Sequence, residues 1–367
     1  MDRRNWLALC GAAAWPGCSR KILAGYAFVA AEEGKALAVV DLGALAVARR
    51  IALAGAPSQV IAHQARRAVF ALLPESGVIV EVDAQSLSVR RQARLATRIL
   101  SMRLSPDGAS LWALTAEPSK LVRLGLDGFQ PGAAIPLPAG ATDFDLAPYD
   151  PLAAVGFASS GRVAIADLQA RATRPLVATG AGLAAVRFRS DGRQFLVTNP
   201  AERSLSILDT ASGRMVTRLP LAVRPDQICF SADGGQLFIT GEGMDAVVVV
   251  YPYRTEIAQT RLAGRSPGAM AASLKPGFLY VANPHSADVT IIDIQTHRVI
   301  AMTSVGSEPS FITVTPDGEY ALVLNRVSGD MAIIRSGAVQ DNRRKSAPLL
   351  TMIPVGSKPV SAAVMPI

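Results

Sequence analysis

A short apolar run recurs every 42 residues along almost the whole chain. The eight copies are AFVA at Ala27, VFAL at Val69, LWAL at Leu111, AAVG at Ala153, FLVT at Phe195, LFIT at Leu237, LYVA at Leu279 and ALVL at Ala321. A fixed period of this length is typical of repeat proteins, in which each unit buries its apolar face against its neighbours. The period therefore favours one closed domain over the two or three that a length of 367 residues would otherwise allow.

Residues 279–320 show the repeating unit most clearly. They contain four runs rich in β-branched and aromatic residues: LYVAN, VTIIDI, RVIAMTSV and PSFITV. This composition is typical of strands. The last run leads into Thr315-Pro316-Asp317-Gly318, where proline presets φ and glycine accepts positive φ. Four short strands in each repeat indicate a β-propeller.

A proline before one run of each unit fixes the reading frame. Pro57, Pro225, Pro267 and Pro309 are spaced by multiples of 42 residues, whereas Pro359 is displaced by eight. The displacement locates an insertion at 336–349, which we expect to be an exposed polar loop. In propellers of this repeat type, the run that starts at this proline is the innermost strand of a blade.

This frame also predicts how the ring closes. The chain begins, at Tyr26, with the second strand of a blade and ends with an innermost strand that lacks partners. The predicted fold is an all-β, eight-bladed β-propeller of four-stranded antiparallel blades over residues 26–367. Pairing of the C-terminal strand with the N-terminal blade closes it, which removes exposed strand edges.

A carboxylate recurs at one phase of the repeat, where the third strand of a blade ends. The residues are Asp41, Asp83, Asp167, Asp209 and Asp293. Two interpretations are open: the five carboxylates form a ring of ligands, or each one closes a turn of its own blade. A short acidic residue at the end of a strand usually accepts hydrogen bonds from its own backbone, so we predict turns.

The N-terminus has the composition of an export signal. Arg3 and Arg4 precede an apolar run that is too short to span a bilayer. We predict a signal peptide over residues 1–18, of twin-arginine type, and a short linker over 19–25. Cys18 lies where a bacterial lipoprotein carries its lipidated cysteine, although Trp15-Pro16-Gly17 departs from the usual lipobox. We expect an exported protein that is either periplasmic or attached to the membrane only through Cys18.

Charge and cysteine content narrow the function classes. The net charge is +8 and aromatic residues are 5% of the chain, and basic residues cluster only at 342–345. Nucleic-acid sites interleave aromatic residues with arginine, so no nucleic-acid partner is predicted.

Cys229 is the one cysteine after the leader, and we predict that it is a small buried hydrophobe.

The runs LYVAN, VTIID, RVIAMTSVG and TPDG resemble the YVTN-type repeat. That repeat is found in bacterial and archaeal surface or periplasmic propellers and in the wider lactonase-like propeller group. The resemblance covers nearly all of residues 26–367 and implies the fold, but its matching residues are packing and turn positions. Eight-bladed relatives also include the haem-binding domain of dissimilatory nitrite reductase and related proteins of that haem's biosynthesis. Those resemble this chain in architecture and export only.

Sites on propellers usually lie at the mouth of the central channel, where loops enter the innermost strands and leave the second ones. The ligand-binding residues expected there are Gln59, Asp143, Asp226, Gln227, Arg203, Asn283, His285 and Asn325. This set carries both signs of charge. It suits a polar small molecule or a peptide.

Catalytic motifs are scarce. The three histidines, His63, His285 and His297, are far apart in the sequence, and no zinc motif, G-x-S-x-G elbow or P-loop is present. We therefore predict no metal and no cofactor. His285 is the best candidate for a general base or an axial haem ligand, and Glu242 is the second catalytic candidate.

Three functions follow from these patterns. The favoured one is a monomeric binding or scaffold module of the cell envelope, whose partner is an envelope protein or a polar small molecule. The first alternative is a lactonase-like hydrolase that uses Glu242 or His285. The second is a haem-binding or redox-associated propeller.

Overall fold

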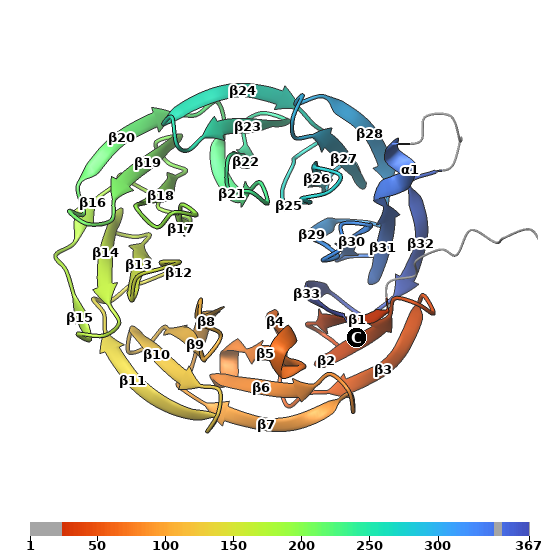
Figure 1. Cartoon of the computed structure of the whole chain (residues 1–367), viewed down its shortest axis with the longest axis horizontal. Helices are drawn as coiled ribbons and strands as arrows, with labels where there is room; N and C mark the ends of the chain where they lie inside the picture. The colour runs from red at the N-terminus through yellow and green to blue at the C-terminus, as the bar shows by residue number, and fades with distance from the viewer. Residues whose placement is uncertain (1–23, 341–346, 367) are drawn as a thin grey trace, which may run out of the picture.

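The computed structural model describes residues 24–340 and 347–366, and its strands form eight antiparallel blades arranged in a ring (Figure 1). Each blade runs from an innermost strand beside the ring axis to an outermost strand on the rim. We call the face where the innermost strands begin the upper face, and the opposite face the lower face. The predicted eight-bladed propeller is confirmed.

The first four blades are built as follows. Blade 1 contains β33 (Pro359–Pro366), β1 (Gly25–Ala31), β2 (Ala36–Asp41) and β3 (Ala46–Ala52). Blade 2 contains β4 (Gln59–His63), β5 (Ala68–Leu73), β6 (Val78–Asp83) and β7 (Ser88–Arg94). Blade 3 contains β8 (Ile99–Leu104), β9 (Ser110–Thr115), β10 (Lys120–Gly125) and β11 (Gln130–Pro136). Blade 4 contains β12 (Asp143–Leu146), β13 (Leu152–Phe157), β14 (Arg162–Asp167), β15 (Ala172–Thr173) and β16 (Val177–Ala178).

The remaining four blades complete the ring. Blade 5 contains β17 (Val186–Phe188), β18 (Gln194–Asn199), β19 (Ser204–Asp209) and β20 (Met215–Pro220). Blade 6 contains β21 (Arg224–Phe230), β22 (Leu237–Glu242), β23 (Ala246–Tyr251) and β24 (Glu256–Leu262). Blade 7 contains β25 (Met270–Ala272), β26 (Phe278–Asn283), β27 (Asp288–Asp293) and β28 (Val299–Ser304). Blade 8 contains β29 (Pro309–Val314), β30 (Tyr320–Asn325), β31 (Asp330–Arg335) and β32 (Leu349–Pro354).

Short helices interrupt this pattern at three places. They are η1 (Gln64–Arg66), η2 (Pro74–Ser76) and α1 (Ser336–Gln340). Within the described residues, no helix has the length and apolar character needed to cross a membrane.

The core lies between the blades. The middle strands of each blade are buried on both faces because a neighbouring blade covers each side; every residue of β5, β9 and β26 is buried. Outermost strands such as β7 are exposed at most positions. In seven blades a β-bulge interrupts the pairing of this outermost strand with the third one. Bulges of this kind discourage an open edge from pairing with another chain.

Strand β33 closes the ring by pairing with β1. Tyr26 lies opposite Met365 and Ala30 opposite Ser361 in an antiparallel register. Arg50 of the same blade donates from Nη1 to the carbonyl of Val355, at 2.7 Å. The predicted closure, with three N-terminal strands and one C-terminal strand in a blade, is therefore confirmed.

The repeated aspartates form turns, as predicted. Asp41 Oδ1 accepts the backbone N–H groups of Gly43 and Ala44 at 2.8 and 2.9 Å. The same carboxylate-to-backbone hydrogen bonds occur at Asp83, Asp167, Asp209 and Asp293. These side chains provide acceptors for the backbone N–H groups of the turn where the third strand of a blade ends.

The insertion in blade 8 differs from the expected loop at its start. Ser336 is 1% exposed, and its hydroxyl lies 2.7 Å from the phenol oxygen of Tyr280 on the neighbouring blade. This contact holds the first turn as α1. Residues 341–346, Cys18 and the rest of the predicted signal peptide lie outside the described residues.

Candidate functional site

A hollow of about 430 Å³, the upper hollow, opens on the upper face beside blades 6 and 7. Its rigid walls include Pro200, Pro225, Pro267 and Pro284. Its charged side chains are Arg224, Asp226 and Glu242. Arg224 Nη1 lies 3.6 Å from Glu242 Oε2, and both side chains are at least half exposed. Solvent screens such a pair, so both charges are available to a ligand.

A β-bulge directs Asp226 into this hollow. Pro225 pairs with Gly241, whereas the next pair in the register is Gln227 with Thr240. Asp226 is therefore the extra residue, and bulges redirect the side chain that they carry. Gly241 is required opposite the bulge because a Cβ there would overlap the carbonyl oxygen of Arg224.

The structure brings together some of the residues that the sequence nominated. Asp226 and Glu242 line the upper hollow, and Gln227 Nε2 donates to Asp226 Oδ2 at 3.2 Å. Arg203 and His285 are exposed on neighbouring loops of the upper face but do not line the hollow.

Asn283 and Asn325 lie inside their blades and not at the mouth. Both are fully buried. Asn283 Nδ2 donates to Asp288 Oδ1 at 2.6 Å and to Thr290 Oγ1 at 2.9 Å, and Asn325 donates to Asp330 in the same way. Such buried amides stabilise the hairpin between the second and third strands, and a ligand at the mouth would not reach them.

Gln59 and Asp143 lie at the start of innermost strands and link adjacent blades. Gln59 donates to the carbonyl of Met102 and accepts its N–H, both at 3.0 Å. Asp143 Oδ2 accepts the N–H of Val186 on the next blade at 3.0 Å. These side chains hold neighbouring innermost strands in register, which accounts for them without a ligand.

Four charged side chains gather on the innermost strands of blades 3, 4 and 5. Arg187 Nη1 lies 2.6 Å from Asp143 Oδ2, and Arg103 lies 3.5 Å from Asp143 and 3.9 Å from Asp145. Burial raises the pKa of Asp145 despite both arginines, and burial together with Arg187 lowers the pKa of Arg103. The two positive and two negative charges balance each other.

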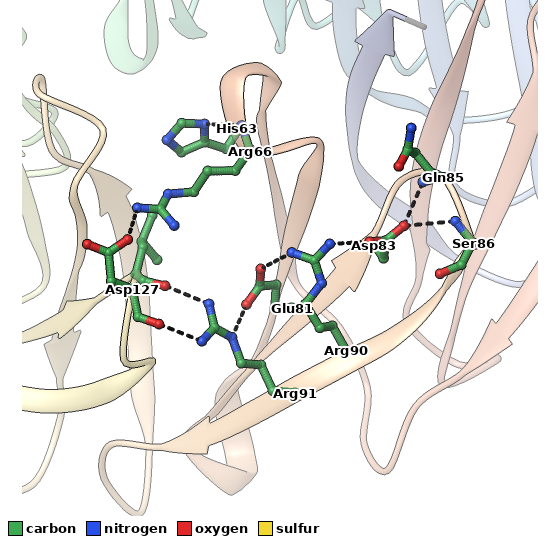
Figure 2. A network of polar contacts seen from close by, with 10 residues as sticks. His63, Arg66, Glu81, Asp83, Gln85, Ser86, Arg90, Arg91 and Asp127 are labelled. Carbon is green, nitrogen blue, oxygen red and sulfur yellow. Dashed lines mark hydrogen bonds and ion pairs between the residues drawn. The ribbon is translucent and has the colours of Figure 1, made fainter.

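A second polar network joins blades 2 and 3 near the rim (Figure 2). Glu81, which is 1% exposed, forms ion pairs with Arg90 and Arg91. Arg91 also donates to the carbonyls of Asp127 and Leu126 at 2.8 and 2.6 Å. Because every charge in this network has a partner, we interpret it as a blade-to-blade connection and not as a site.

The other histidines and the cysteine are engaged in the fold. His63 Nε2 lies 2.9 Å from the carbonyl oxygen of Gly108, and His297 lies between Gln236 and Gln259. Cys229 is partly buried and packs against the apolar cluster between blades 6 and 7, so the predicted buried hydrophobe is confirmed only in part. Desolvation raises the pKa of its thiol to about 12. Among the described residues, no group of three or more His, Cys, Asp or Glu side chains could hold a metal ion.

Sequence reasoning missed the charged group on the innermost strands, although the sequence contains a signal for it. Arg103, Asp145 and Arg187 are spaced by 42 residues, so they occupy one phase of the repeat. Opposite charges at one phase of consecutive blades must meet across the blade boundary. Arg224 was also missed, because it precedes the proline that was taken as the start of its strand.

No family model matches the chain. The seven-bladed beta-propeller protein Rv1057 of Mycobacterium tuberculosis is 30% identical over 118 residues, which are 31% of this chain and 30% of that protein. The match spans less than a third of either chain, so the fold is shown by the eight blades described above and not by this match. The chain is a β-propeller protein.

Solved structures share the propeller fold at low identity. Dihydro-heme d1 dehydrogenase NirN, solved in complex with DHE, matches at a TM-score of 0.77 and 15% identity, covering 93% of this chain and 75% of that one. Apo AztD from Citrobacter koseri matches at 0.71 and 14%, covering 94% and 98%. Hydrazine synthase of Kuenenia stuttgartiensis matches at 0.60 and 18%, covering 76% and 95%. At these identities the likeness concerns the fold alone.

Proposed function

We propose that this β-propeller is an exported binding module of the cell envelope that holds a polar ligand or a segment of a partner protein in the upper hollow. The observation that carries the proposal is the convergence of Arg224, Asp226 and Glu242 on one proline-walled hollow at the mouth. Asp226 and Glu242 are both expected at the mouth from the sequence, and both line this hollow.

The lining of the hollow suits binding better than catalysis. Rigid walls reduce the entropy that is lost when a ligand is held. The exposed carboxylates and Arg224 offer both signs of charge, which suits a zwitterionic ligand or a peptide with mixed charges. Among the residues that line it, Ser266 is the one hydroxyl nucleophile, and no histidine lines the hollow to activate it.

Native mass spectrometry and crosslinking test this proposal on mature protein purified from the envelope of its own host. We expect extra mass or a specific crosslinked partner, which the double variant Asp226→Asn, Glu242→Gln loses. Glu75→Gln is the matched control, because Glu75 forms an exposed pair with Arg98 on the upper face of blade 2, at 3.2 Å. If the control also lost the ligand, or if the double variant retained it, the upper hollow would be rejected as the binding site.

Export and anchoring need a separate experiment. We propose that the leader is cleaved or lipidated at Cys18, and labelling of cells with a palmitate analogue distinguishes the two. Label on the wild type that disappears in Cys18→Ala supports an anchor. Protein found only in the cytoplasm would contradict export altogether.

Haem binding is the second candidate function. It rests on the shared fold with NirN and on His285, which is exposed at the mouth and has no hydrogen-bond partner among the described residues. His63 and His297 already form hydrogen bonds within the fold, and Arg103 and Arg187 on the innermost strands already form ion pairs with Asp143. A visible absorption band that His285→Ala abolishes would promote this candidate. Hydrolysis of simple lactones, lost in Glu242→Gln or His285→Ala, would likewise promote the hydrolase alternative.

A further inference from the structure

A second hollow, of about 500 Å³, opens on the lower face between blades 3 and 4. We call it the lower hollow. Its volume lies in the range of about 300–1,000 Å³ that is usual for small-molecule sites. The side chains that matter for its chemistry are Trp112, Arg123, Tyr149, Asp150, Gln169 and Arg171.

Blade 3 departs from most copies of the repeat at the lower hollow. At the position of Arg123, six other blades carry buried aliphatic residues: Val39, Ile165, Ile207, Val249, Ile291 and Ile333. Blade 2 carries Glu81 there, which is 1% exposed and forms ion pairs with Arg90 and Arg91. Arg123 is instead exposed and forms no ion pair within the described residues. The neighbouring outermost strand carries the small residues Gly132 and Ala133, so space is left beside the guanidinium.

Blade 4 departs from the repeat on the opposite wall. Blades 3, 5, 6 and 8 close the first hairpin with an aspartate whose carboxylate accepts hydrogen bonds within the turn, as Asp107, Asp191, Asp233 and Asp317 do. Blades 2 and 7 carry Ala65 and Lys275 there. Blade 4 has Tyr149 at this position, and Tyr149 is 79% exposed. Its ring therefore contributes an open aromatic surface at the rim of the hollow and little to packing.

The lining offers hydrogen-bond donors that the fold does not use. Trp112 is 5% exposed, whereas Phe28 and Phe70 at equivalent positions carry no polar atom. Its indole N–H donates to no protein atom among the described residues, although buried indoles usually find an acceptor.

The guanidiniums of Arg123 and Arg171 form no ion pair in the part of the chain that the structure describes, unlike those in Figure 2. Asp107 also lines the hollow, but its carboxylate accepts hydrogen bonds from the Ser105 hydroxyl and the Ala109 N–H. These hydrogen bonds, and the charge of Arg123 at longer range, lower the pKa of Asp107.

We propose that the lower hollow binds a carbohydrate that carries a carboxylate. The carboxylate would pair with Arg123 or Arg171, for which a guanidinium has matching geometry. The C–H face of the sugar ring would pack on the phenol ring of Tyr149, whose face is electronegative. Sugar hydroxyls accept from the indole N–H and donate to Asp150. This site is separate from the upper hollow, so the proposal does not depend on the function proposed there.

Isothermal titration calorimetry tests the proposal with two probes, tri-galacturonate and the neutral maltotriose. We expect tri-galacturonate to bind the full chain and maltotriose to bind at least about tenfold more weakly, a difference of about 1.4 kcal/mol. Arg123→Val introduces the aliphatic residue type that six other blades carry at this position, so it should fold at least as stably as the wild type. Arg123→Val and Arg171→Gln should each weaken tri-galacturonate binding about tenfold or more, and Tyr149→Ala several-fold.

Arg214→Gln is the matched control, because Arg214 is an exposed arginine in a lower-face turn of blade 5. It should bind tri-galacturonate as the wild type does, and so should Asp226→Asn in the upper hollow. Absence of saturable tri-galacturonate binding would overturn the proposal. Equal binding of maltotriose, or unchanged binding by a folded Arg123→Val protein, would also overturn it.

Discussion

Blades 7 and 4 derive from the same repeat but differ in how closely they follow it. Blade 7 has four uninterrupted strands, a buried Asn283 that ties its second and third strands, and Ala269 and Ala271 at the positions of Asp143 and Asp145 of blade 4. Blade 4 has Phe157 where blade 7 has Asn283, two aspartates on its innermost strand, and an outermost strand that is divided into β15 and β16.

The difference shows which positions of the repeat serve packing and which are free to change. The turn at the end of the third strand is similar in the two blades, since the carboxylates of Asp167 and Asp293 both accept backbone N–H donors within it. The innermost strand and the lower-face turn differ, and they carry Asp143, Asp145 and Tyr149 in blade 4. The carboxylate that closes the third-strand turn is thus retained, whereas the innermost strand and the buried position of Phe157 and Asn283 diverge.

Lowering the pH should produce the largest loss of stability. It should also distinguish carboxyl groups whose pKa is lowered in the folded protein from Asp145, whose pKa is raised. Hydrogen bonding from Ser86 and pairing with Arg90 lower the pKa of Asp83 to about 2, and hydrogen bonding from Ser212 lowers that of Asp209. Their stabilisation is present above the unfolded pKa of about 3.9 and is lost as the pH falls towards about 2. We expect the melting temperature to fall across this window.

Asp145 should titrate in the opposite sense. Burial raises its pKa above the unfolded value, so its contribution to stability grows as the pH falls and is lost as the pH rises. Asp145→Asn should therefore lose more stability on acidification than the wild type does. Parallel melting curves for the two proteins from neutral pH to about pH 2 would contradict this assignment.

Removing a carboxylate from the innermost strand of blade 4 should have the next largest effect. Asp143→Ala leaves the N–H of Val186 and the guanidinium of Arg187 without their acceptor, at a cost of about 3 kcal/mol. Urea denaturation measures the change. Ser101→Ala, at the equivalent position of blade 3, removes a buried hydroxyl that has no partner and should change stability by less than about 0.5 kcal/mol. Similar losses of stability in both variants would mean that any substitution at this position of an innermost strand destabilises the fold, whatever hydrogen bonds its side chain makes.

Blade 7 should be most sensitive at its buried amide. Asn283→Ala removes the donor to Asp288 and Thr290, which should cost about 2 kcal/mol. Blade 4 has no counterpart, and its Phe157 contributes apolar burial instead. The same urea experiment applies, and a loss below about 0.5 kcal/mol would show that the amide is dispensable for the hairpin.

The shared turn should respond equally in the two blades. Asp167→Ala and Asp293→Ala each remove hydrogen bonds to an exposed turn, so we expect about 1 kcal/mol in either case. Thermal melts of the two variants compare them directly. A twofold difference would mean that blade context, and not the turn itself, sets the contribution.

The smallest effect is expected at Tyr149. Tyr149→Ala should change stability by less than about 0.5 kcal/mol, because the side chain is 79% exposed. Tyr280→Phe of blade 7 should cost about 1 kcal/mol, because it removes the hydrogen bond to Ser336. If Tyr149→Ala destabilised the protein more than Tyr280→Phe, Tyr149 would be a packing residue and the lower hollow would lose its aromatic wall.

The period of the repeat was sufficient to predict the blades, their number and the closing strand, because blade packing imposes the same residue types at each copy. The period did not predict how deeply a residue lies within its blade. Asn283 and Asn325 end their strands on the upper side of the ring, but both are fully buried. Gly264 and Gly306 approach their side chains so closely that a Cβ on either glycine would overlap them.

Site residues were predictable only where a loop position determines exposure. Asp226 and Glu242 follow from the reading frame alone. Arg123 and Tyr149 became notable only after each was compared with its equivalents in the other blades, because a single copy gives no reason to expect a valine or an aspartate there.

The pairing of β33 with β1 has a consequence for synthesis. The inner edge of blade 1 stays open until residues 359–366 have been made, because no other strand within residues 24–340 and 347–366 pairs with it. A nascent chain can form isolated blades but not the ring. Ring formation therefore coincides with completion of the last strand, so that an incomplete chain retains an unpaired edge by which it can be distinguished from the finished protein.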